Sequence, residues 1–377
     1  MRPVALDLFG DLDTRRAAHW FCAGSPDGRG FDTLRMQTAL ARLARRPDVL
    51  GWVAGGGFED CPDLMQACAQ ALPLIGNEWK TIDALKAPGT FFPMLDELGI
   101  GYPPTQLSPP SSPAGWLSKR VGATGGGHVR RLEPAPRRER QPAAISSLLA
   151  ATSSKLPRTA PVTRFYQREA SGAPMSLLFI ADGRRMRPVG WNRLLVGAVG
   201  RRPFVFHGAV GPVTLTREAE AAATRAAAQI TRRAGLAGLN SMDFLLDGEA
   251  VSVLEINPRP SATIALHDVS FAGGLLKAHL DACTRRFLPP EAQARQVPVR
   301  GFRIAYARRQ LMAGSAGRRH LKELGWCHDI GPIGALTDVG GPLCTVSAEG
   351  SCSQEVTDRL AQRVLVARRI HEDDDGS

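Results

Sequence analysis

The chain has 377 residues, of which 44% are hydrophobic and 22% charged, a composition typical of a globular protein with two or three domains. No apolar run approaches the roughly 18 residues of a membrane-spanning helix, so we expect no membrane span. The formal charge of +11 favours anionic partners such as nucleotides or polycarboxylates, although an arginine-rich genomic background would also produce it. Aromatic residues make up only 6% and do not alternate with basic stretches, which argues against a nucleic-acid platform.

The cysteines and the N-terminus bear on the cellular compartment. Seven cysteines include no C-x-x-C pair, so neither a zinc knuckle nor a redox motif is expected. The opening MRPVALDLFGDLDTRR carries acids too early for a secretory signal and has no small-residue cleavage site. These features favour a cytoplasmic protein.

The first eighty residues alternate short apolar runs with helical patterns. The runs are VALDLF, LGWVAGGG and LPLIG, and this rhythm predicts a βαβ arrangement with a small parallel sheet over residues 1–80. The stretch GWVAGGGFED lacks G-x-G-x-x-G. It is either a loop that approaches a ligand or only a tight turn between a strand and a helix.

The pattern changes after residue 80. TIDALKAPGTFFPMLDELGIGYPPTQ predicts two helices with a break at the proline between them, followed by a linker at 108–115 and a strand, WLSKRV. Residues 133–162 are rich in Arg, Pro, Ala and Ser, and their SSLLAATSSKL is at most a short helix. Further strands are expected in RFYQREASG, in MSLLFIADG and over 187–215.

The second half begins with an alanine-rich helix. Thr214 or Thr216 is its expected N-cap and Gly235 its C-terminal stop. NSMDFLLDGEAVSVLEINPR then predicts a hairpin that turns at Asp247-Gly248. Beyond residue 300 we expect strands in GFRIAYARRQ and PLCTVSAEG, a closing amphipathic helix, and a frayed EDDDGS tail.

The hairpin carries the residues with the clearest chemistry. Glu255 and Asn257 alternate on its second strand and Asp243 lies on the first, so two carboxylates and an amide oxygen could form a hard-oxygen site for Mg²⁺. A two-residue turn at Asp247-Gly248 would place Asp243 and Glu255 on opposite faces, whereas an odd loop or one bulge would bring them together. The alternative is that both acids are ordinary polar residues on a solvated face, which the apolar residues around them disfavour.

Three other elements could contact phosphates or a nucleotide. Arg259 follows the hairpin, and its guanidinium could hold a phosphoryl group or a carboxylate, although an arginine between two prolines could also be a surface loop residue. The stretch KRVGATGGGH combines Lys119 with glycines whose backbone could approach phosphates. FYQREASG could pair with an adenine edge through extended backbone, with Gln167 or Glu169 reaching polar atoms, or could be a plain edge strand. The glycines concerned are Gly122, Gly125, Gly126 and Gly127.

The order of these elements resembles the ATP-grasp superfamily over roughly residues 80–290. The resemblance implies an α/β chain of the α+β ATP-grasp fold. Its parts are a pre-ATP-grasp domain at 1–80, a two-lobed ATP-grasp domain at 81–290 with its lid at about 113–185, and a β-rich C-terminal extension at 291–377 that completes the core. It further implies that ATP contacts Lys86, Lys119, the four glycines, Tyr166, Gln167 and Glu169. Asp243, Glu255 and Asn257 would hold Mg²⁺ or Mn²⁺, and Arg259 and Lys119 would be catalytic.

The chain departs from the superfamily pattern at one position. Many members have a ribose-binding Glu where this chain has Pro174-Met175, so Glu169 or another residue would contact the ribose. The phrases DLFGDLDTR, PFVFHGAVGP and EINPRPSAT resemble ATP-grasp ligases associated with tetrahydromethanopterin and methanofuran-type coenzymes. That resemblance implies amide formation through an acyl-phosphate, with L-glutamate among the substrates and a homodimer as the assembly. The alternatives are a carboxylase related to biotin carboxylase, a non-catalytic nucleotide-binding module, and a nucleic-acid-binding protein.

Overall fold

The computed structural model describes residues 3–24, 30–133, 163–268, 271, 273–290 and 298–374. Nearly all of the stretch at 133–162, including the short helix considered there, lies outside the described residues. None of the described helices has the length and hydropathy needed to cross a membrane.

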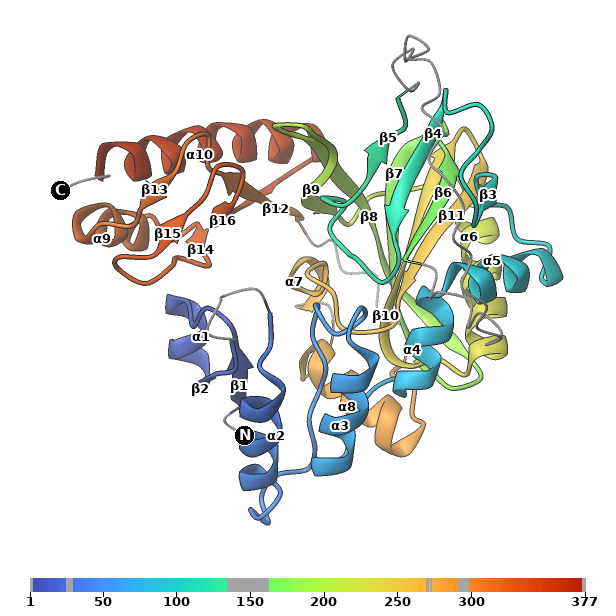
Figure 1. The fold of residues 1–377 in the computed structure, drawn as a ribbon, viewed down its shortest axis with the longest axis horizontal. Coiled ribbons are helices and arrows are strands. Elements are labelled where there is room, and N and C mark those ends of the chain that lie inside the picture. The colour runs from blue at the N-terminus through green and yellow to red at the C-terminus, as the bar shows by residue number, and fades with distance from the viewer. Residues whose placement is uncertain are drawn as a thin grey trace, which may run out of the picture.

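A large antiparallel sheet forms the centre of the molecule (Figure 1). It has eight strands in the order β11-β10-β7-β8-β9-β12-β16-β14. The mixed α/β class expected from the sequence is therefore confirmed. The strands are β7 (Ala173–Asp182), β8 (Met186–Val199), β9 (Arg202–Gly211), β10 (Ala237–Asp247), β11 (Ala250–Asn257), β12 (Val299–Tyr306), β14 (Cys327–His328) and β16 (Pro342–Gly350).

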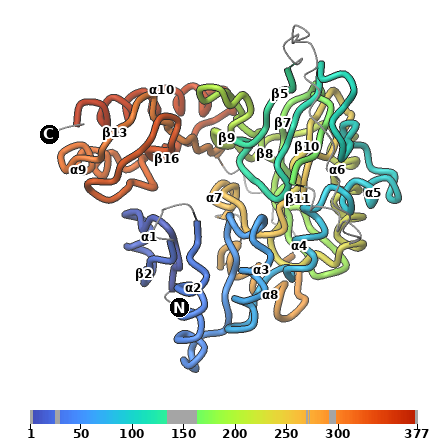
Figure 2. The backbone as a smooth tube through the Cα atoms, viewed as in Figure 1, coloured from blue at the N-terminus to red at the C-terminus, as the bar shows by residue number. Residues whose placement is uncertain are grey.

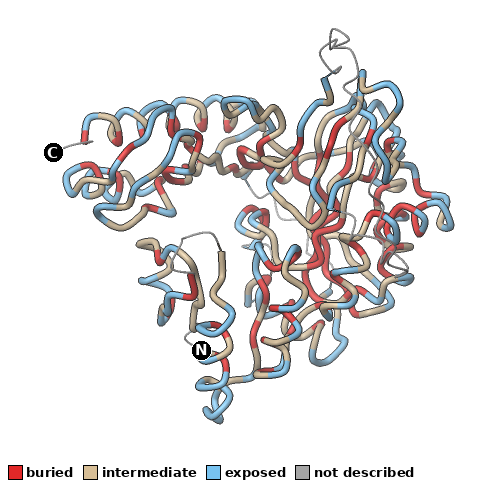
Figure 3. The backbone as a smooth tube through the Cα atoms, in the orientation of Figure 1, coloured by how far each residue is buried: buried red, intermediate tan, exposed pale blue. Residues whose placement is uncertain are grey.

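Helices cover both faces of the large sheet around β7 and β10. Alternate residues of β7 point to opposite sides, so Leu177 and Phe179 join one buried cluster and Leu178 and Ile180 another. The first cluster includes alanines of α6 (Arg217–Ala234), and the second includes residues of α8 (Gly274–Arg285). Figure 3 shows the resulting buried centre of the sheet. A four-residue helix, α7 (Ile264–His267), lies near β9 and β12.

The ends of α6 follow from its terminal residues, as predicted. Thr216 is the N-cap, and its side chain accepts a hydrogen bond from the Ala219 N–H. Gly235 ends the helix in a left-handed conformation with φ of 68°.

The N-terminal segment forms a small layer beside the large sheet. β1 and β2 pair in parallel, and Trp52 and Leu74 add a single parallel bridge, so the βαβ rhythm gives only short strands. Its elements are β1 (Val4–Asp7), α1 (Leu12–Ala17), β2 (His19–Cys22), α2 (Thr33–Leu43) and α3 (Pro62–Ala71). The two helices expected next are α4 (Trp79–Lys86) and α5 (Pro88–Glu97), and the proline that begins α5 separates them.

A second antiparallel sheet has four strands and faces the large sheet. The cavity described below lies between the two sheets. The strand order of this second sheet is β3-β6-β4-β5. β7, which the sequence placed in the lid at about 113–185, pairs instead with β8 and β10 of the large sheet. The four strands are β3 (Thr105–Gln106), β4 (Trp116–Arg120), β5 (Arg130–Arg131) and β6 (Arg164–Arg168).

The C-terminal segment extends the large sheet and covers it. α10 (Ser353–Asp374) packs along β12 and β16, and it continues through three residues of the expected frayed tail. α9 (Ser315–Glu323) and a two-stranded sheet of β13 (Leu311–Met312) and β15 (Leu336–Thr337) complete this part. The two terminal segments lie side by side, as Figure 2 shows, and the Asp329 N–H donates to Asp13 Oδ2 at 3.0 Å.

Candidate functional site

A β-bulge in the hairpin of β10 and β11 decides how its acids are arranged. The strands turn at Gly248-Glu249, with Asp247 paired to Ala250, one residue later than predicted. Phe244 pairs with Val253 but Asp243 pairs with Glu255, so Leu254 is the extra residue of a bulge. With the two-residue turn alone, Asp243 and Glu255 would lie on opposite faces of the hairpin, and the extra residue brings them to the same face. Asp243, Glu255 and Asn257 therefore share a face.

Hydrogen bonds tie these three residues into one network. Ser176 Oγ donates to Asp243 Oδ1 at 2.7 Å, and Asn257 Nδ2 donates to Asp243 Oδ2 at 3.1 Å. Lys86 Nζ, at the end of α4, donates to Glu255 Oε2 at 2.9 Å and to Asn257 Oδ1 at 3.0 Å. The Lys86 side chain is only 6% exposed, so its charge is held among these oxygens.

The protonation of the two acids reflects their closeness. Burial, together with the negative charge of Glu255, raises the pKa of Asp243 to about 7. Burial also opposes ionisation of Glu255, but the positive charge of Lys86, with smaller contributions from Lys119 and Arg259, lowers its pKa below the ordinary value. A pair of carboxylates beside an amide oxygen is a donor set that fits Mg²⁺, because hard oxygen ligands are those it prefers.

Lys119 lies on β4 and faces the same cavity. Its Nζ donates to Gln167 Oε1 at 2.6 Å. Burial lowers the pKa of Lys119 to about 8, although the charge of Glu255 acts in the opposite direction. On β6, Gln167 lines the cavity, while the preceding residue, Tyr166, does not. Glu169 also lines it and pairs with Arg131 Nη2 at 2.6 Å.

The glycine-rich loop lies against β9. The Phe206 N–H donates to the Gly125 carbonyl oxygen at 3.0 Å. Gly126 has φ of +70°, and a Cβ there would collide with the Phe204 carbonyl oxygen. This position therefore requires glycine. Gly122, Gly125 and Gly126 line the cavity, and Gly127 does not.

These elements enclose a cavity of about 660 Å³ between the two sheets. Its wall combines the hairpin acids, Lys86, Lys119 and Arg259 with many apolar side chains. A lining of both kinds suits a ligand that has a charged part and a flat hydrophobic part. The apolar residues include Leu85, Phe91, Phe92, Leu117, Phe165, Leu194, Phe204, Phe206 and Leu245.

Glu59, which no sequence motif had singled out, lies against Arg259. Glu59 forms an ion pair with the Arg259 guanidinium, and the two side chains are only 3% and 15% exposed. Glu59 belongs to GWVAGGGFED, whose Gly57 N–H donates to Glu59 Oε2 at 2.9 Å. This loop also reaches the glycine-rich loop, because a Cβ on Gly122 would lie 2.9 Å from the Glu59 carbonyl oxygen. The only sequence signal was one acid after a run of glycines.

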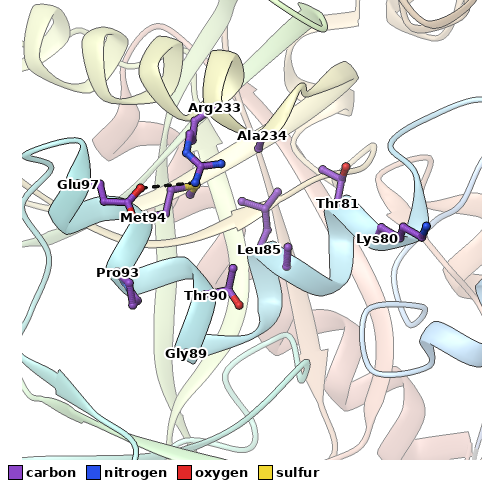
Figure 4. Close-up of a pocket in the computed structure, with 11 residues that line it drawn as sticks. Lys80, Thr81, Leu85, Gly89, Thr90, Pro93, Met94, Glu97, Arg233 and Ala234 are labelled. Atoms are coloured by element: carbon purple, nitrogen blue, oxygen red, sulfur yellow. Dashed lines mark hydrogen bonds and ion pairs between the residues drawn. The ribbon is translucent and has the colours of Figure 1, made fainter.

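A second hollow of about 430 Å³ lies on the outer side of α4 and α5, beside the end of α6 (Figure 4). Arg233 and Glu97 meet across it, with Nη2 and Oε2 3.5 Å apart. Lys80 points away from this pair in Figure 4. The hollow therefore lacks the convergence of acids and lysines found in the larger cavity.

Comparison with known proteins gives the class of the fold first. The structure is similar to the L-amino acid ligase of Bacillus licheniformis, with a TM-score of 0.63 and 15% identity over 92% of this chain and 86% of that one. It is similar to biotin carboxylase of Campylobacter jejuni, with a TM-score of 0.66 and 11% identity over 98% and 87% of the two chains. For carboxyaminoimidazole ribonucleotide synthase of Aspergillus clavatus, solved with ATP, the TM-score is 0.62 and the identity 14%, over 98% and 99%. These likenesses show a common fold.

The family follows from the sequence. The model of the ATP-grasp domain matches residues 75–263, and this chain belongs to that family. The matched range contains the hairpin acids, both lysines, the glycine-rich loop and Arg259. No curated protein sequence matches the chain.

Proposed function

We propose that this protein is an ATP- and Mg²⁺-dependent ligase that joins a small-molecule carboxylate to an amine through an acyl-phosphate. The observation that carries the proposal is the convergence of Asp243, Glu255 and Asn257 with two lysines in one cavity. Membership of the ATP-grasp family supports the use of ATP.

The nucleotide would lie between the two sheets. Lys86 and Lys119 would neutralise its phosphates, and the glycine-rich loop would offer backbone N–H groups to them. The adenine would contact the segment of Tyr166 and Gln167 in β6, and Glu169, just beyond that strand on the cavity wall, would reach the ribose. The loop glycines assigned to this role are Gly122, Gly125, Gly126 and Gly127.

Asp243, Glu255 and Asn257 would hold Mg²⁺, or Mn²⁺ in its place. The ion would supply positive charge beside the phosphate oxygens, which carry negative charge throughout phosphoryl transfer. The residues themselves orient the reactants. Arg259 and Lys119 would stabilise the charge that develops on the transferred phosphoryl group.

The chemistry needs no protein nucleophile. A carboxylate oxygen of the substrate attacks the γ-phosphorus of ATP, and the bond between that phosphorus and the bridging oxygen breaks to release ADP. The amine then attacks the acyl carbon, loses a proton, and displaces phosphate to leave an amide. Catalysis rests on positioning and charge neutralisation, and the glycine-rich loop would keep water from the acyl-phosphate.

For the substrates we propose addition of an amino acid such as L-glutamate to a precursor of a one-carbon carrier coenzyme, of the methanofuran or tetrahydromethanopterin type. Support comes from three stretches, DLFGDLDTR, PFVFHGAVGP and EINPRPSAT, which resemble the ligases associated with those coenzymes. We further propose that the enzyme acts in the cytoplasm as a homodimer, without nucleic-acid or membrane partners.

The test is ADP release by the purified protein with ATP and Mg²⁺. Reactions contain L-glutamate with tyramine, furan-type or pterin-type acceptors, and mass spectrometry identifies the products. A product heavier by one or more glutamyl units supports the ligase and names the acceptor. ADP release that depends on bicarbonate alone would favour a carboxylase. ATP binding without turnover on any substrate would favour a non-catalytic nucleotide-binding module.

Glu255→Gln tests the metal ligands with a matched control. This variant should lose ADP release, because it removes one of two carboxylates from the proposed Mg²⁺ site. Glu249→Gln makes the same chemical change in the exposed turn of the same hairpin and should behave as wild type. Equal activity of the two variants would contradict the metal assignment.

A further inference from the structure

Among the described residues, the Arg259 guanidinium has partners for only some of its N–H donors. Its Nε–H donates to Glu59 Oε1, and one N–H of Nη1 donates to the Pro260 carbonyl oxygen at 3.2 Å. No acceptor within the described part of the chain takes the N–H groups of Nη2. Arg259 also lines the cavity between the two sheets. Its remaining donors are therefore available to a ligand in that cavity.

Glu59 holds the guanidinium in one orientation. The Glu59 side chain is only 3% exposed, and its second oxygen, Oε2, accepts the Gly57 N–H at 2.9 Å. One carboxylate oxygen is thus bound to Arg259 and the other to the backbone of the loop that carries Glu59. Because Nε belongs to the rigid plane of the guanidinium, a carboxylate that is itself fixed restricts the direction in which Nη1 and Nη2 point.

The backbone around Arg259 is also held from the N-terminal segment. Asn77 Nδ2 donates to the carbonyl oxygen of Pro258, the residue directly before Arg259, at 2.9 Å. A Cβ on Gly56 would lie 3.5 Å from Arg259 Cζ, so the loop passes close beside the guanidinium. The position of Arg259 therefore depends on residues that precede α4 as well as on the hairpin.

The loop that carries Glu59 also borders the glycine-rich loop. Asp60 Oδ2 pairs with Arg120 Nη2 at 3.3 Å, and a Cβ on Gly122 would lie 2.9 Å from the Glu59 carbonyl oxygen. The side chain of Glu59 thus holds Arg259, while its backbone lies against the loop assigned to the phosphates. Glu59 itself does not line the cavity. Its influence on a bound nucleotide must therefore pass through its neighbours.

We propose that Glu59 is a positioning residue for phosphoryl transfer, which fixes the Arg259 guanidinium so that its Nη2 edge receives the γ-phosphoryl group of ATP. The γ-phosphoryl oxygens are charged acceptors, and a guanidinium binds them best when its N–H groups already point toward them. Glu59 acts through Arg259 and makes no contact with the nucleotide. The proposal rests on the ATP site of the proposed function and not on the identity of the carboxylate or the amine.

Titration calorimetry of the full chain with Mg²⁺ and either ADP or β,γ-imido-ATP isolates the contact with the γ-phosphoryl group. The measured quantity is the ratio of the two affinities, that for the ATP analogue over that for ADP. Arg259→Met should lower this ratio about tenfold or more, because it removes charge-assisted hydrogen bonds. Glu59→Gln should lower it about threefold or more and leave ADP affinity unchanged, because one amide oxygen cannot serve both the Arg259 Nε–H and the Gly57 N–H.

Two further variants separate positioning from other roles. Glu78→Gln makes the same chemical change at an exposed residue whose side chain does not cap α4, and both affinities should match wild type. In the double variant of Glu59→Gln with Arg259→Met, the ratio should equal that of Arg259→Met alone, because no guanidinium is left to position. If Glu59→Gln fails to fold, Glu59→Asp keeps the charge of the buried pair, retracts the carboxylate by one methylene group, and should also lower the ratio.

Equal ratios for wild type and the Glu59 variants would overturn the proposal. A further fall of the ratio in the double variant would do the same, since Glu59 would then act independently of Arg259. A parallel loss of affinity for ADP and for the analogue is the result of a purely structural role and would also overturn it. A lowered ratio in a protein that releases no ADP with any acceptor would uphold this inference while refuting the ligase. Failure of the wild type to bind either nucleotide would refute the ATP site and, with it, this inference.

Discussion

Nucleotide affinity should depend on pH because Lys119 has a lowered pKa. Burial brings that pKa to about 8 in the free protein, so Lys119 loses its proton as the pH rises through this value. Bound phosphates favour the charged ammonium and raise its pKa in the complex. Above pH 8, nucleotide binding must therefore be accompanied by uptake of a proton at Lys119.

The size of the effect follows from linkage. Affinity falls tenfold for each pH unit above the free-state pKa, until the pKa of the complex is reached. From pH 7 to pH 9.5 the loss is about 30-fold, or about 2 kcal/mol, provided that the complex keeps Lys119 charged over this range. Below pH 7 the lysine contributes almost no pH dependence.

Titration calorimetry with a non-hydrolysable ATP analogue and excess Mg²⁺, from pH 6.5 to 9.5, measures this dependence. Lys119→Arg is the control, because a guanidinium stays charged throughout and shares every other source of pH dependence. The wild-type affinity should fall relative to this variant above pH 8. Parallel curves for the two proteins would refute the reasoning.

Three further perturbations give distinct results. Gly126→Ala should weaken nucleotide binding more than Gly125→Ala, because the two glycines have φ of +70° and +72° but only a Cβ at 126 meets the backbone of β9. Equal affinities in calorimetry would contradict this. Glu59→Ala should lower the free energy of unfolding by about 3 kcal/mol, because it leaves the Arg259 guanidinium buried without its partner. Glu59→Gln should lose less in urea titrations, and no loss in either would be contrary evidence. His267 is 2% exposed and burial lowers its pKa to about 4, so the unfolded chain binds this proton more readily below pH 6.5. Stability from His267 is therefore complete above pH 6.5 and falls by about 3 kcal/mol toward pH 4, a loss that His267→Gln should lack in urea titrations at both pH values.

The sequence was sufficient where local chemistry decides the structure. The alanine content of α6, with Thr216 before it and Gly235 after it, fixes both ends of that helix. The break between α4 and α5 follows from Pro88, and it places Lys86 at the end of a helix that faces the hairpin. A helix cap, a terminal glycine or a proline break can be predicted because the contacts involved are made by residues close together in the sequence.

Other features depend on contacts between distant segments. Glu59 and Arg259 are 200 positions apart in the sequence, and no sequence feature near either residue predicts their ion pair. The βαβ rhythm of the first eighty residues was recognised, but pattern alone does not show that its strands shorten to β1, β2 and one bridge. In each case the packing of a remote element decides the result.

The bulges at Leu254 and His207 show how the alternation rule fails where it matters. Each inserts one residue into an antiparallel pair and reverses the faces of everything beyond it, so the periodicity that identifies a strand cannot predict which side its polar residues take. At Leu254 the reversal gathers two acids and an amide on the cavity side. At His207 it takes a buried histidine out of the regular ladder. A regular strand would have separated the hairpin acids, so the irregular position at Leu254 is the one that gives the sheet its chemistry.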